Sequence, residues 1–285
     1  MASARSVARV AAAEPCERGI RCDRPRVALS ATQLVTLRRY LARRRNIRPG
    51  SAIEVERRVN RILAINSSIS GEASVSRVLV EETVQRLLAA IPDALVTRRD
   101  LSDVPVPHLT PDTVAGIRAV ATTEDELAAQ GLSDDLIAEL QEATILVIGA
   151  PMYNFSIPTT LRSWFDHVLR PRVTFSFSES GPQGLLTGIR AIVIQARGGL
   201  YSEGPGKVLD FQEPYLKQLL GFVGITDVAF VHAEKIGFGP EARDVAIAHA
   251  RGQIEAAVAR IAAGGTAVHV PDETVGADHT VAARP

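Results

Sequence analysis

The segment Met152-Tyr153-Asn154-Phe155 holds the side chains of this chain that are best suited to bind a flat organic ring. It follows an almost wholly apolar run at residues 144–151 and precedes a helix expected from about Pro158. In a doubly wound α/β sheet, ligands bind in the loops at the carboxyl ends of the strands. A thioether and two aromatic rings can cover a heteroaromatic ring, and the Asn154 carboxamide can reach its polar edge. A flavin has this shape, although such residues can also serve only to pack the strand-to-helix turn.

Serines occupy the corresponding position after the first expected strand, residues 59–65. Ser68 follows that strand, and Ser74, Val75 and Ser76 stand where the next helix should begin. The amino terminus of a helix stabilises an anion, because its unpaired N–H groups point outward and the helix dipole is positive there. A phosphate group suits this position. Serines there can equally be ordinary helix caps.

Ala196-Arg197-Gly198-Gly199 follows the fourth expected strand. Paired glycines let the backbone approach a ligand where a Cβ atom would collide, although glycines after a strand also simply form turns. The loop at residues 66–76 has neither the dinucleotide pattern G-x-G-x-x-G nor the nucleoside-triphosphate pattern G-x-x-x-x-G-K-[ST], which argues against a classical Rossmann enzyme or an ATPase. His167, His232 and Asp166 do not match a nucleophilic triad, so hydrolysis has no support.

Several motifs in the same order resemble those of the FMN-dependent NADH-azoreductases, which belong to the flavodoxin-like quinone reductase group. The resemblance covers about residues 59–263. The motifs are Asn66-Ser67-Ser68-Ile69, residues 150–158, Val173-Thr174-Phe175, residues 181–185, Ala196-Arg197-Gly198-Gly199 and residues 220–228.

The resemblance implies that FMN is bound without a covalent link, and that Phe177 and Phe222 line an apolar substrate face for quinones and azo dyes. Taken alone, Phe222 can also be a core residue. NADH would reduce the FMN and leave before the acceptor binds to the same face, and the enzyme would be a homodimer with its site near the subunit boundary. No side chain is expected to carry the hydride chemistry, which belongs to the flavin. The implied cofactor-binding residues are Ser68, Ser74, Val75, Ser76, Met152, Tyr153, Asn154, Phe155, Ala196, Arg197, Gly198 and Gly199.

A rival function is that of a flavodoxin-like electron carrier or a flavin-binding regulator that does not turn over NADH. Carriers tend to be smaller and acidic, whereas this chain has a long connection at residues 102–131 and candidate substrate aromatics. These features favour the enzyme.

Apolar runs alternating with helical patterns predict a flavodoxin-like, doubly wound, five-stranded parallel sheet with helices on both faces. The expected strands are residues 59–65, 94–99, 144–150, 190–196 and 228–233. The expected helices are residues 75–90, 133–143 with Ser133 as N-cap, 158–169, 214–222 and 240–263, and a loop or hairpin is expected at 173–177.

Charge divides the chain into three parts: an Arg-rich extension at residues 1–58, the domain at 59–263 and a polar tail at 264–285. The extension holds 14 Arg and 5 acidic residues of the chain's 32 basic and 32 acidic residues, which leaves 18 basic and 27 acidic residues elsewhere. It is interpreted as a disordered extension or a start that the cell does not use. Two further interpretations are a transit peptide and a nucleic-acid tether. The acidic residues of the extension argue against the first, and its lack of interleaved aromatics argues against the second.

The positions of the cysteines and the hydropathy pattern restrict the expected cellular location of the protein. Cys16 and Cys22 both lie in the extension, so the domain has no disulfide or thiol nucleophile, and no metal site is expected. No run approaches the roughly 18 to 20 apolar residues of a membrane span. These features predict a cytoplasmic protein that acts on small molecules.

Overall fold

The computed structural model describes residues 59–179 and 181–264. Neither the Arg-rich extension nor the tail beyond residue 264 falls within the described residues, so the interpretations made for residues 1–58 lie outside them. The short segment at residues 59–60 leads directly into the first strand.

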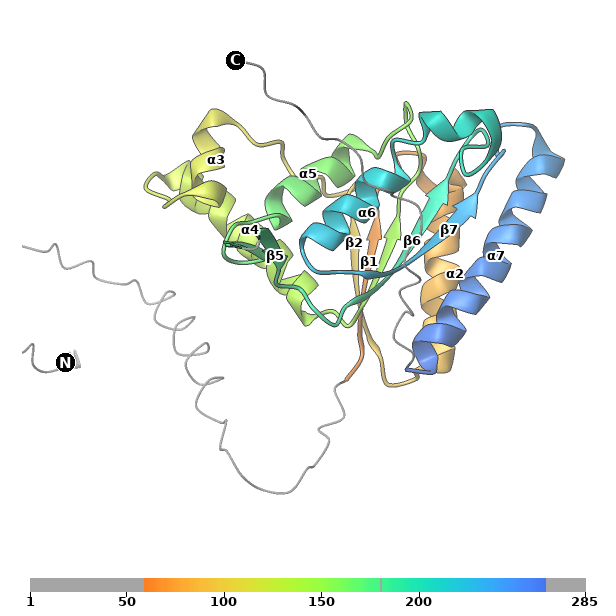
Figure 1. Ribbon diagram of the computed structural model, residues 1–285, viewed down its shortest axis with the longest axis horizontal. Coiled ribbons are helices and arrows are strands. Elements are labelled where there is room, and N and C mark those ends of the chain that lie inside the picture. The colour runs from red at the N-terminus through yellow and green to blue at the C-terminus, as the bar shows by residue number, and fades with distance from the viewer. Residues whose placement is uncertain (1–58, 180, 265–285) are drawn as a thin grey trace, which may run out of the picture. The chain divides into compact units, whose positions relative to one another are not determined.

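The five strands of the predicted sheet are present and all run parallel (Figure 1). Their order is β2-β1-β3-β6-β7, which places β1 and β3 in the middle beside β6. Strand β3 is buried along its whole length, as its unbroken apolar sequence predicts for a strand covered on both faces. The bounds are β1 Arg61–Asn66, β2 Leu95–Asp100, β3 Ile145–Gly149, β6 Arg190–Ala196 and β7 Asp227–Ala233.

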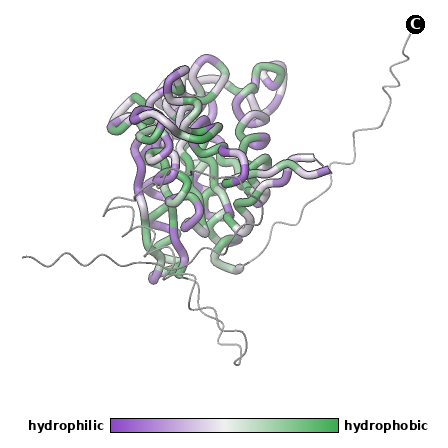
Figure 2. Tube along the Cα trace, turned by 90° about the vertical axis from the view of Figure 1, so that its left-hand side faces the viewer, coloured by the Kyte–Doolittle hydropathy of each residue, from purple (hydrophilic) through white to green (hydrophobic). Residues whose placement is uncertain are grey.

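Helices cover both faces of the sheet and bury alternate residues of each strand. In β1, Ile62 packs on one side with α2 (Val75–Ala90) and α7 (Pro240–Ala262). Its neighbour Leu63 packs on the other side with α4 (Glu124–Glu142), α5 (Thr159–Val168) and α6 (Glu213–Phe222). Figure 2 shows hydrophobic segments in the middle of the fold. In the described part of the chain, no helix is both long and apolar enough to span a membrane.

The connection at residues 102–131 differs from its prediction, because it contains α3 (Pro111–Arg118) and the start of α4. Helix α4 begins at Glu124 rather than at Ser133. A capping box explains the earlier start: the Thr123 hydroxyl accepts from the Glu126 N–H at 3.2 Å, and the Glu126 carboxylate accepts from the Thr123 N–H at 3.1 Å. Ser133 is therefore not an N-cap. It lies buried within α4, and its hydroxyl donates to the His167 carbonyl at 2.8 Å.

The expected loop or hairpin is an antiparallel hairpin, β4 (Phe175–Ser178) and β5 (Gly181–Gly184). It packs backbone to backbone against the turn between α6 and β7. A Cβ atom on Gly184 would lie 2.1 Å from the Gly224 nitrogen, so only glycine fits there. Because this hairpin leads into β6 and that turn leads into β7, both lie at the amino edge of the sheet.

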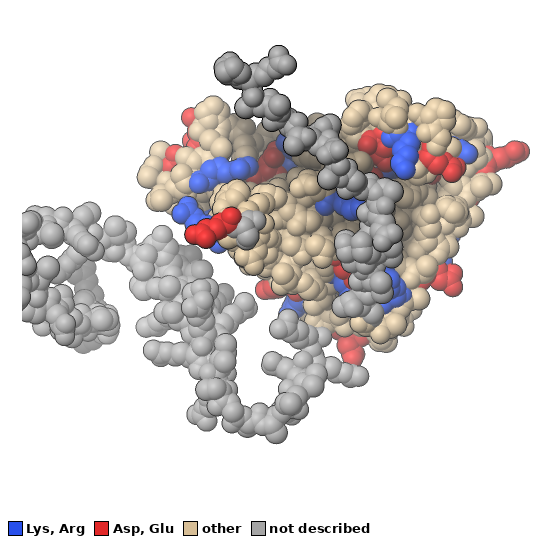
Figure 3. Space-filling model, viewed as in Figure 1, with Lys and Arg blue, Asp and Glu red and all other residues tan. Residues whose placement is uncertain are grey.

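Charged side chains of both signs are interspersed on the face shown in Figure 3. Many are paired. Arg99 and Glu139 are 2.6 Å apart, and Arg251 and Glu82 are also 2.6 Å apart. In this view the described residues present mixed charge rather than the basic surface that nucleic-acid binding requires.

Candidate functional site

The three loops predicted to bind a ligand meet at the carboxyl edge of the sheet. They follow β1, β3 and β6, which are hydrogen-bonded neighbours. Adjacent strands lie about 5 Å apart, so their carboxyl ends present a continuous surface. The Met152 N–H donates to the Ala196 carbonyl at 2.9 Å, which joins the second loop directly to the third.

The second loop is a tight turn with two residues in left-handed conformations. The Tyr153 N–H donates to the Ser156 carbonyl at 3.0 Å, and the Ser156 N–H donates to the Tyr153 carbonyl at 3.1 Å. Between them, Asn154 has φ of 49° and Phe155 has φ of 69°, the pattern of a type I′ turn. Asn tolerates this conformation, whereas for Phe it costs roughly 1–2 kcal/mol. Such strain is concentrated at functional sites.

Hydrogen bonds also join the second loop to the first. The Tyr153 hydroxyl lies 3.2 Å from Ser68 Oγ and accepts from the Ile69 N–H at 3.3 Å. Ser67, which is fully buried, donates its hydroxyl hydrogen to the Gly149 carbonyl at 2.7 Å. The ends of β1 and β3 are therefore held together at this edge.

One serine of the first loop, Ser74, has a capping role in this structure. Ser74 is the N-cap of α2 and accepts from the Arg77 N–H at 3.2 Å, while its Oγ lies 3.1 Å from Ser76 Oγ. Ser74, Ser76 and Val75 are all buried. The helix-cap interpretation thus holds for Ser74. An anion contact by these residues stays a prediction, and the groups that suit it are the amides of the first helical turn.

The third loop offers open space at one glycine. A Cβ atom on Gly198 would meet no heavy atom within 4 Å, whereas one on Gly199 would lie 3.1 Å from the Tyr201 ring. Backbone bonds hold the loop in place: the Arg197 N–H donates to the Ala233 carbonyl at 2.8 Å, and the Gly237 N–H donates to the Gly198 carbonyl at 3.1 Å. Ala196 itself is buried.

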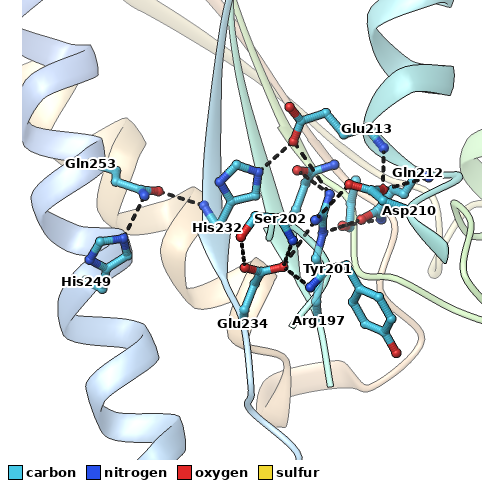
Figure 4. A network of polar contacts seen from close by, with 12 residues as sticks. Arg197, Tyr201, Ser202, Asp210, Gln212, Glu213, His232, Glu234, His249 and Gln253 are labelled. Carbon is cyan, nitrogen blue, oxygen red and sulfur yellow. Dashed lines mark hydrogen bonds and ion pairs between the residues drawn. The ribbon is translucent and has the colours of Figure 1, made fainter. Parts of the chain in front are cut away.

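The Arg197 side chain is turned into the protein, where it is fully buried (Figure 4). Its Nε donates to Gln212 Oε1 at 3.1 Å and its Nη2 to Gln195 Oε1 at 2.8 Å. Its Nη1 lies 3.0 Å from the Asp210 carboxylate and 3.2 Å from that of Glu234. The guanidinium thus bonds to side chains of the protein, with a partner at each of its three nitrogens. A cofactor contact by Arg197 remains a prediction only for its backbone.

Sequence reasoning missed two residues of this edge, Glu234 and Tyr201. Glu234 accepts from the Tyr201 N–H at 2.8 Å, and the Tyr201 ring meets Phe155 edge-on with the ring centroids 6.1 Å apart. The signal for Glu234 was its position directly after the fifth strand, at the edge where ligands bind. No local pattern identifies Tyr201.

Burial raises the pKa of Glu234, but the bonds from Ser202 and the Tyr201 amide, with the charge of Arg197, outweigh it and lower the pKa below its ordinary value. Glu234 is therefore ionised at neutral pH. Across the described residues, no three His, Cys, Asp or Glu side chains are grouped as a metal site requires.

The predicted substrate aromatics lie away from the three loops. Phe222 ends α6 and Phe177 belongs to β4, so both precede strands whose carboxyl ends form the site. They belong to one aromatic group, because each contacts Phe175, with ring centroids 4.6 Å and 5.6 Å away. The seven residues of β6 span roughly 20 Å at about 3.3 Å each. Within one protomer, the structure does not bring these rings to the loops.

A hollow of about 470 Å³ lies beside the second loop. It contains Phe211, whose exposed fraction is 60%, and Arg162, whose guanidinium lies 5.2 Å from the centre of the Tyr215 ring. Its other lining residues are Ser156, Asp210 and Pro214.

A larger hollow, of about 840 Å³, runs along α2. Its arginines are paired with carboxylates, as in the ion pair of Arg98 with Glu81 at 3.0 Å. Paired charges of both signs provide no excess charge for a ligand, so the carboxyl-edge loops remain the better candidate.

The family described as flavodoxin-like fold matches residues 60–258 of the chain. The FMN-dependent NADH:quinone oxidoreductase of Hyphomonas neptunium is 60% identical over 196 residues, which cover 69% of this chain and 94% of that protein. The FMN-dependent NADH:quinone oxidoreductase of Azotobacter vinelandii is 49% identical over 195 residues, which cover 68% of this chain and 96% of that protein.

Solved azoreductase structures have a similar fold. An azoreductase of Bacillus anthracis superimposes with a TM-score of 0.64 at 27% identity, over 72% of this chain and 99% of that one. An FMN-dependent NADH-azoreductase of the same species, solved in complex with FMN, gives a TM-score of 0.65 at 25% identity, over 72% of this chain and all of that one (100%).

Proposed function

The chain belongs to the flavodoxin-like fold family and, within it, to the FMN-dependent NADH:quinone oxidoreductases, and we propose that its three carboxyl-edge loops hold the FMN through which it oxidises NADH and reduces quinones and azo compounds. One observation carries the assignment of the site. The loops after β1, β3 and β6 converge, and Gly198 leaves open space against the backbone of the third loop.

The residues of these loops fit the two ends of FMN. The turn at the second loop keeps Asn154 and Phe155 exposed at the sheet edge, where a carboxamide and an aromatic ring suit an isoalloxazine. The open space at Gly198 allows that ring to lie against the backbone. The first turn of α2 supplies amide groups that have no partner within the helix, which suits the phosphate.

Bound FMN would accept a hydride from NADH and pass it to the acceptor. The protein's own residues bind and orient the reactants. Asn154 offers both a donor and an acceptor to the polar edge of the ring, and Phe155 with Tyr201 shields the ring from water. The hollow beside Ser156 and Phe211 provides apolar surface for a flat acceptor. Because one face serves both reactants, NADH must leave before the acceptor binds.

The test of this proposal is spectroscopic and kinetic. Purified protein that is incubated with FMN and then separated from unbound FMN should show the absorbance of bound flavin. Adding NADH without oxygen should bleach this absorbance, and adding a quinone should restore it. Initial rates at varied NADH and quinone should give the parallel double-reciprocal lines of a two-step exchange. If saturating FMN changes neither the spectrum nor the melting temperature of the protein, the proposal that the protein binds FMN is wrong. Bound flavin that NADH leaves oxidised would support the electron-carrier alternative.

The enzyme is proposed to work as a homodimer in which Phe177 and Phe222 act across the subunit boundary. Phe177 is 72% exposed, and within its own protomer it lies at the edge opposite the loops. The partner's Phe177 and the partner's Phe222 would then complete the substrate face.

Mixed dimers test this arrangement. Gly198→Val blocks the ring site of its own subunit, and Phe177→Ala removes the aromatic side chain that its subunit supplies. A mixed dimer of the two variants contains one intact site, so mixing should restore activity that neither variant has alone. Unchanged activity after mixing, with subunit exchange verified by mass, would rule out sharing.

A cytoplasmic location is also proposed. It is supported by the confinement of Cys16 and Cys22 to the extension, which leaves the domain without disulfides. Cell fractionation with an antibody against the domain tests it.

A further inference from the structure

Glu234 receives three hydrogen bonds from two consecutive residues of the third loop. Its Oε1 accepts from the Tyr201 N–H at 2.8 Å and from the Ser202 N–H at 3.0 Å, and its Oε2 accepts from the Ser202 hydroxyl. The carboxylate follows β7, so it spans from the edge strand to the loop after β6 (Figure 4). One side chain thus holds the backbone of the two residues Tyr201 and Ser202, which follow the part of the loop that backbone bonds hold in place.

A buried cation accompanies this carboxylate. Arg197 is fully buried. Its Nη1 contacts Glu234 at 3.2 Å and Asp210 at 3.0 Å. Its Nη2 lies 3.6 Å from Glu213. Gln212, which accepts from Arg197, donates to the Ala150 carbonyl at 2.9 Å. The network therefore reaches the start of the second loop as well as the third.

The position of Tyr201 connects this network to the proposed flavin site. Its backbone is held by Glu234, its ring lies over Gly199, and its ring edge meets Phe155 of the second loop. If Glu234 released the loop, the ring of Tyr201 would lose its fixed place between Gly199 and Phe155.

We propose that Glu234 is a positioning residue for the flavin, which it serves by fixing the backbone and ring of Tyr201, and that Arg197 supports it by charge without its side chain touching the flavin. This inference rests on the proposed function of the site. The guanidinium of Arg197 is hydrogen-bonded to Gln195 and Gln212 and paired with the carboxylates, so only the backbone of Arg197 remains for the predicted cofactor contact.

An ionised carboxylate suits the donors around this position, because three N–H groups donate to Oε1 and the Ser202 hydroxyl donates to Oε2. Tyr201, Ser202 and Arg197 together direct four donor groups at Glu234, and an ionised carboxylate has about four acceptor sites on two oxygens. In Glu234→Gln, the remaining oxygen is neutral and must accept from three N–H groups without the charge that strengthens these bonds, and the NH₂ group meets the Ser202 hydroxyl only if that hydroxyl turns to accept. In Glu234→Asp the charge is kept, but the carboxylate is one methylene shorter.

The experiment compares Glu234→Gln with Glu213→Gln in the full-length protein. Glu213 also lies near Arg197, and its carboxylate lies 2.6 Å from Nε2 of His232, but no loop amide donates to that carboxylate. Both changes remove one negative charge beside the same cation. Only the first weakens the hydrogen bonds that hold Tyr201 and Ser202, so the pair separates loop positioning from loss of charge.

The measurements are the FMN dissociation constant, the visible circular dichroism of bound flavin, and thermal unfolding of the FMN-free protein. Glu234→Gln should raise the dissociation constant about 10- to 100-fold and change the dichroism of the flavin that still binds. Glu213→Gln should change the constant by less than about 3-fold and leave the dichroism unchanged. Ser202→Ala, which removes only the hydroxyl donor, should give a shift of about 2- to 5-fold.

Wild-type affinity and dichroism in a folded Glu234→Gln protein would overturn the proposal, as would an equal loss in Glu213→Gln. If Glu234→Gln fails to fold, the same measurements on Ser202→Ala and Glu234→Asp test the proposal. Wild-type flavin dichroism in both of these variants would overturn it. Failure of the wild-type protein to bind FMN would instead contradict the proposed function, so the two failures are distinguishable.

Discussion

The hydroxyl oxygen of Tyr153 lies 3.2 Å from Oγ of Ser68, and this contact joins the loop after β3 to the loop after β1. Tyr153→Phe removes the link while keeping the ring. Because the Ile69 N–H that also donates to this hydroxyl is exposed, water can replace the bond and stability should change by less than about 1 kcal/mol. FMN affinity should fall about 3- to 10-fold. Equilibrium titration with Tyr215→Phe as the control checks this, and an equal effect in both variants would contradict it.

Phe155→Gly should affect stability and FMN binding in opposite directions. Phe155 adopts φ of 69°, which glycine adopts without a steric penalty. Relief of about 1–2 kcal/mol of strain exceeds the unfolded-state entropy that a glycine adds, so we expect the free energy of unfolding of the FMN-free protein to rise by up to about 1 kcal/mol. FMN should bind more weakly because an aromatic wall is lost. Urea unfolding and flavin titration measure the two effects. Phe238→Gly, at another exposed Phe without a positive φ, should not be stabilised.

Asn154→Asp tests the carboxamide without disturbing the turn. Asp tolerates the left-handed conformation of this position almost as well as Asn, whereas Leu would add strain. The change removes the NH₂ donor and should weaken FMN binding by about 1–3 kcal/mol, with stability of the FMN-free protein unchanged. Wild-type FMN affinity in the Asn154→Asp protein would show that the Asn154 carboxamide does not contribute to FMN binding.

Gly198→Ala should separate folding from binding. Its Cβ atom would enter space that is free of protein atoms, so the FMN-free protein should be as stable as wild type or gain up to about 1 kcal/mol. Flavin occupancy should fall, because that space is where the ring is proposed to lie. Gly252→Ala is the matched control, since a Cβ there is also unobstructed but lies in α7. Equal flavin content in both variants would show that the third loop is only a turn.

His167 should make stability depend on pH. Burial lowers its pKa, although the bond to the Ser163 carbonyl and the charge of Asp166 act in the opposite direction. The unfolded chain therefore takes up the proton first, near the ordinary value of about 6.5. The free energy of unfolding should fall as pH drops below about 6.5, and the fall should end below the lowered pKa of the folded state.

His167→Asn, which keeps a donor for the Ser163 carbonyl, should flatten this dependence between about pH 7 and pH 5. Urea unfolding across that range measures it, with exposed His249→Asn as the control. An unchanged slope in His167→Asn would assign the pH dependence to other groups.

Local patterns in the sequence determined the sheet and the positions of its loops. Short apolar runs bounded by turn residues, such as residues 144–150, predict buried strands, and turn residues such as Asn154 mark where those strands end. The same reasoning placed α4 too late, because the Thr123–Glu126 capping box stands in a polar stretch that was interpreted as connection. A cap contributes only a few interactions, and a hydrophobic pattern does not reveal it.

Only the tertiary structure decided what each loop side chain does. The family resemblance associated Arg197 and Phe177 with one site. In the structure, Arg197 is buried among the carboxylates of Asp210, Glu213 and Glu234, and Phe177 lies at the opposite edge of the sheet. Glu234 contacts Tyr201 across 33 residues of sequence. The physical reason is that spacing along the chain specifies which residues begin or end a strand, whereas the order of strands in the sheet specifies which of those residues meet.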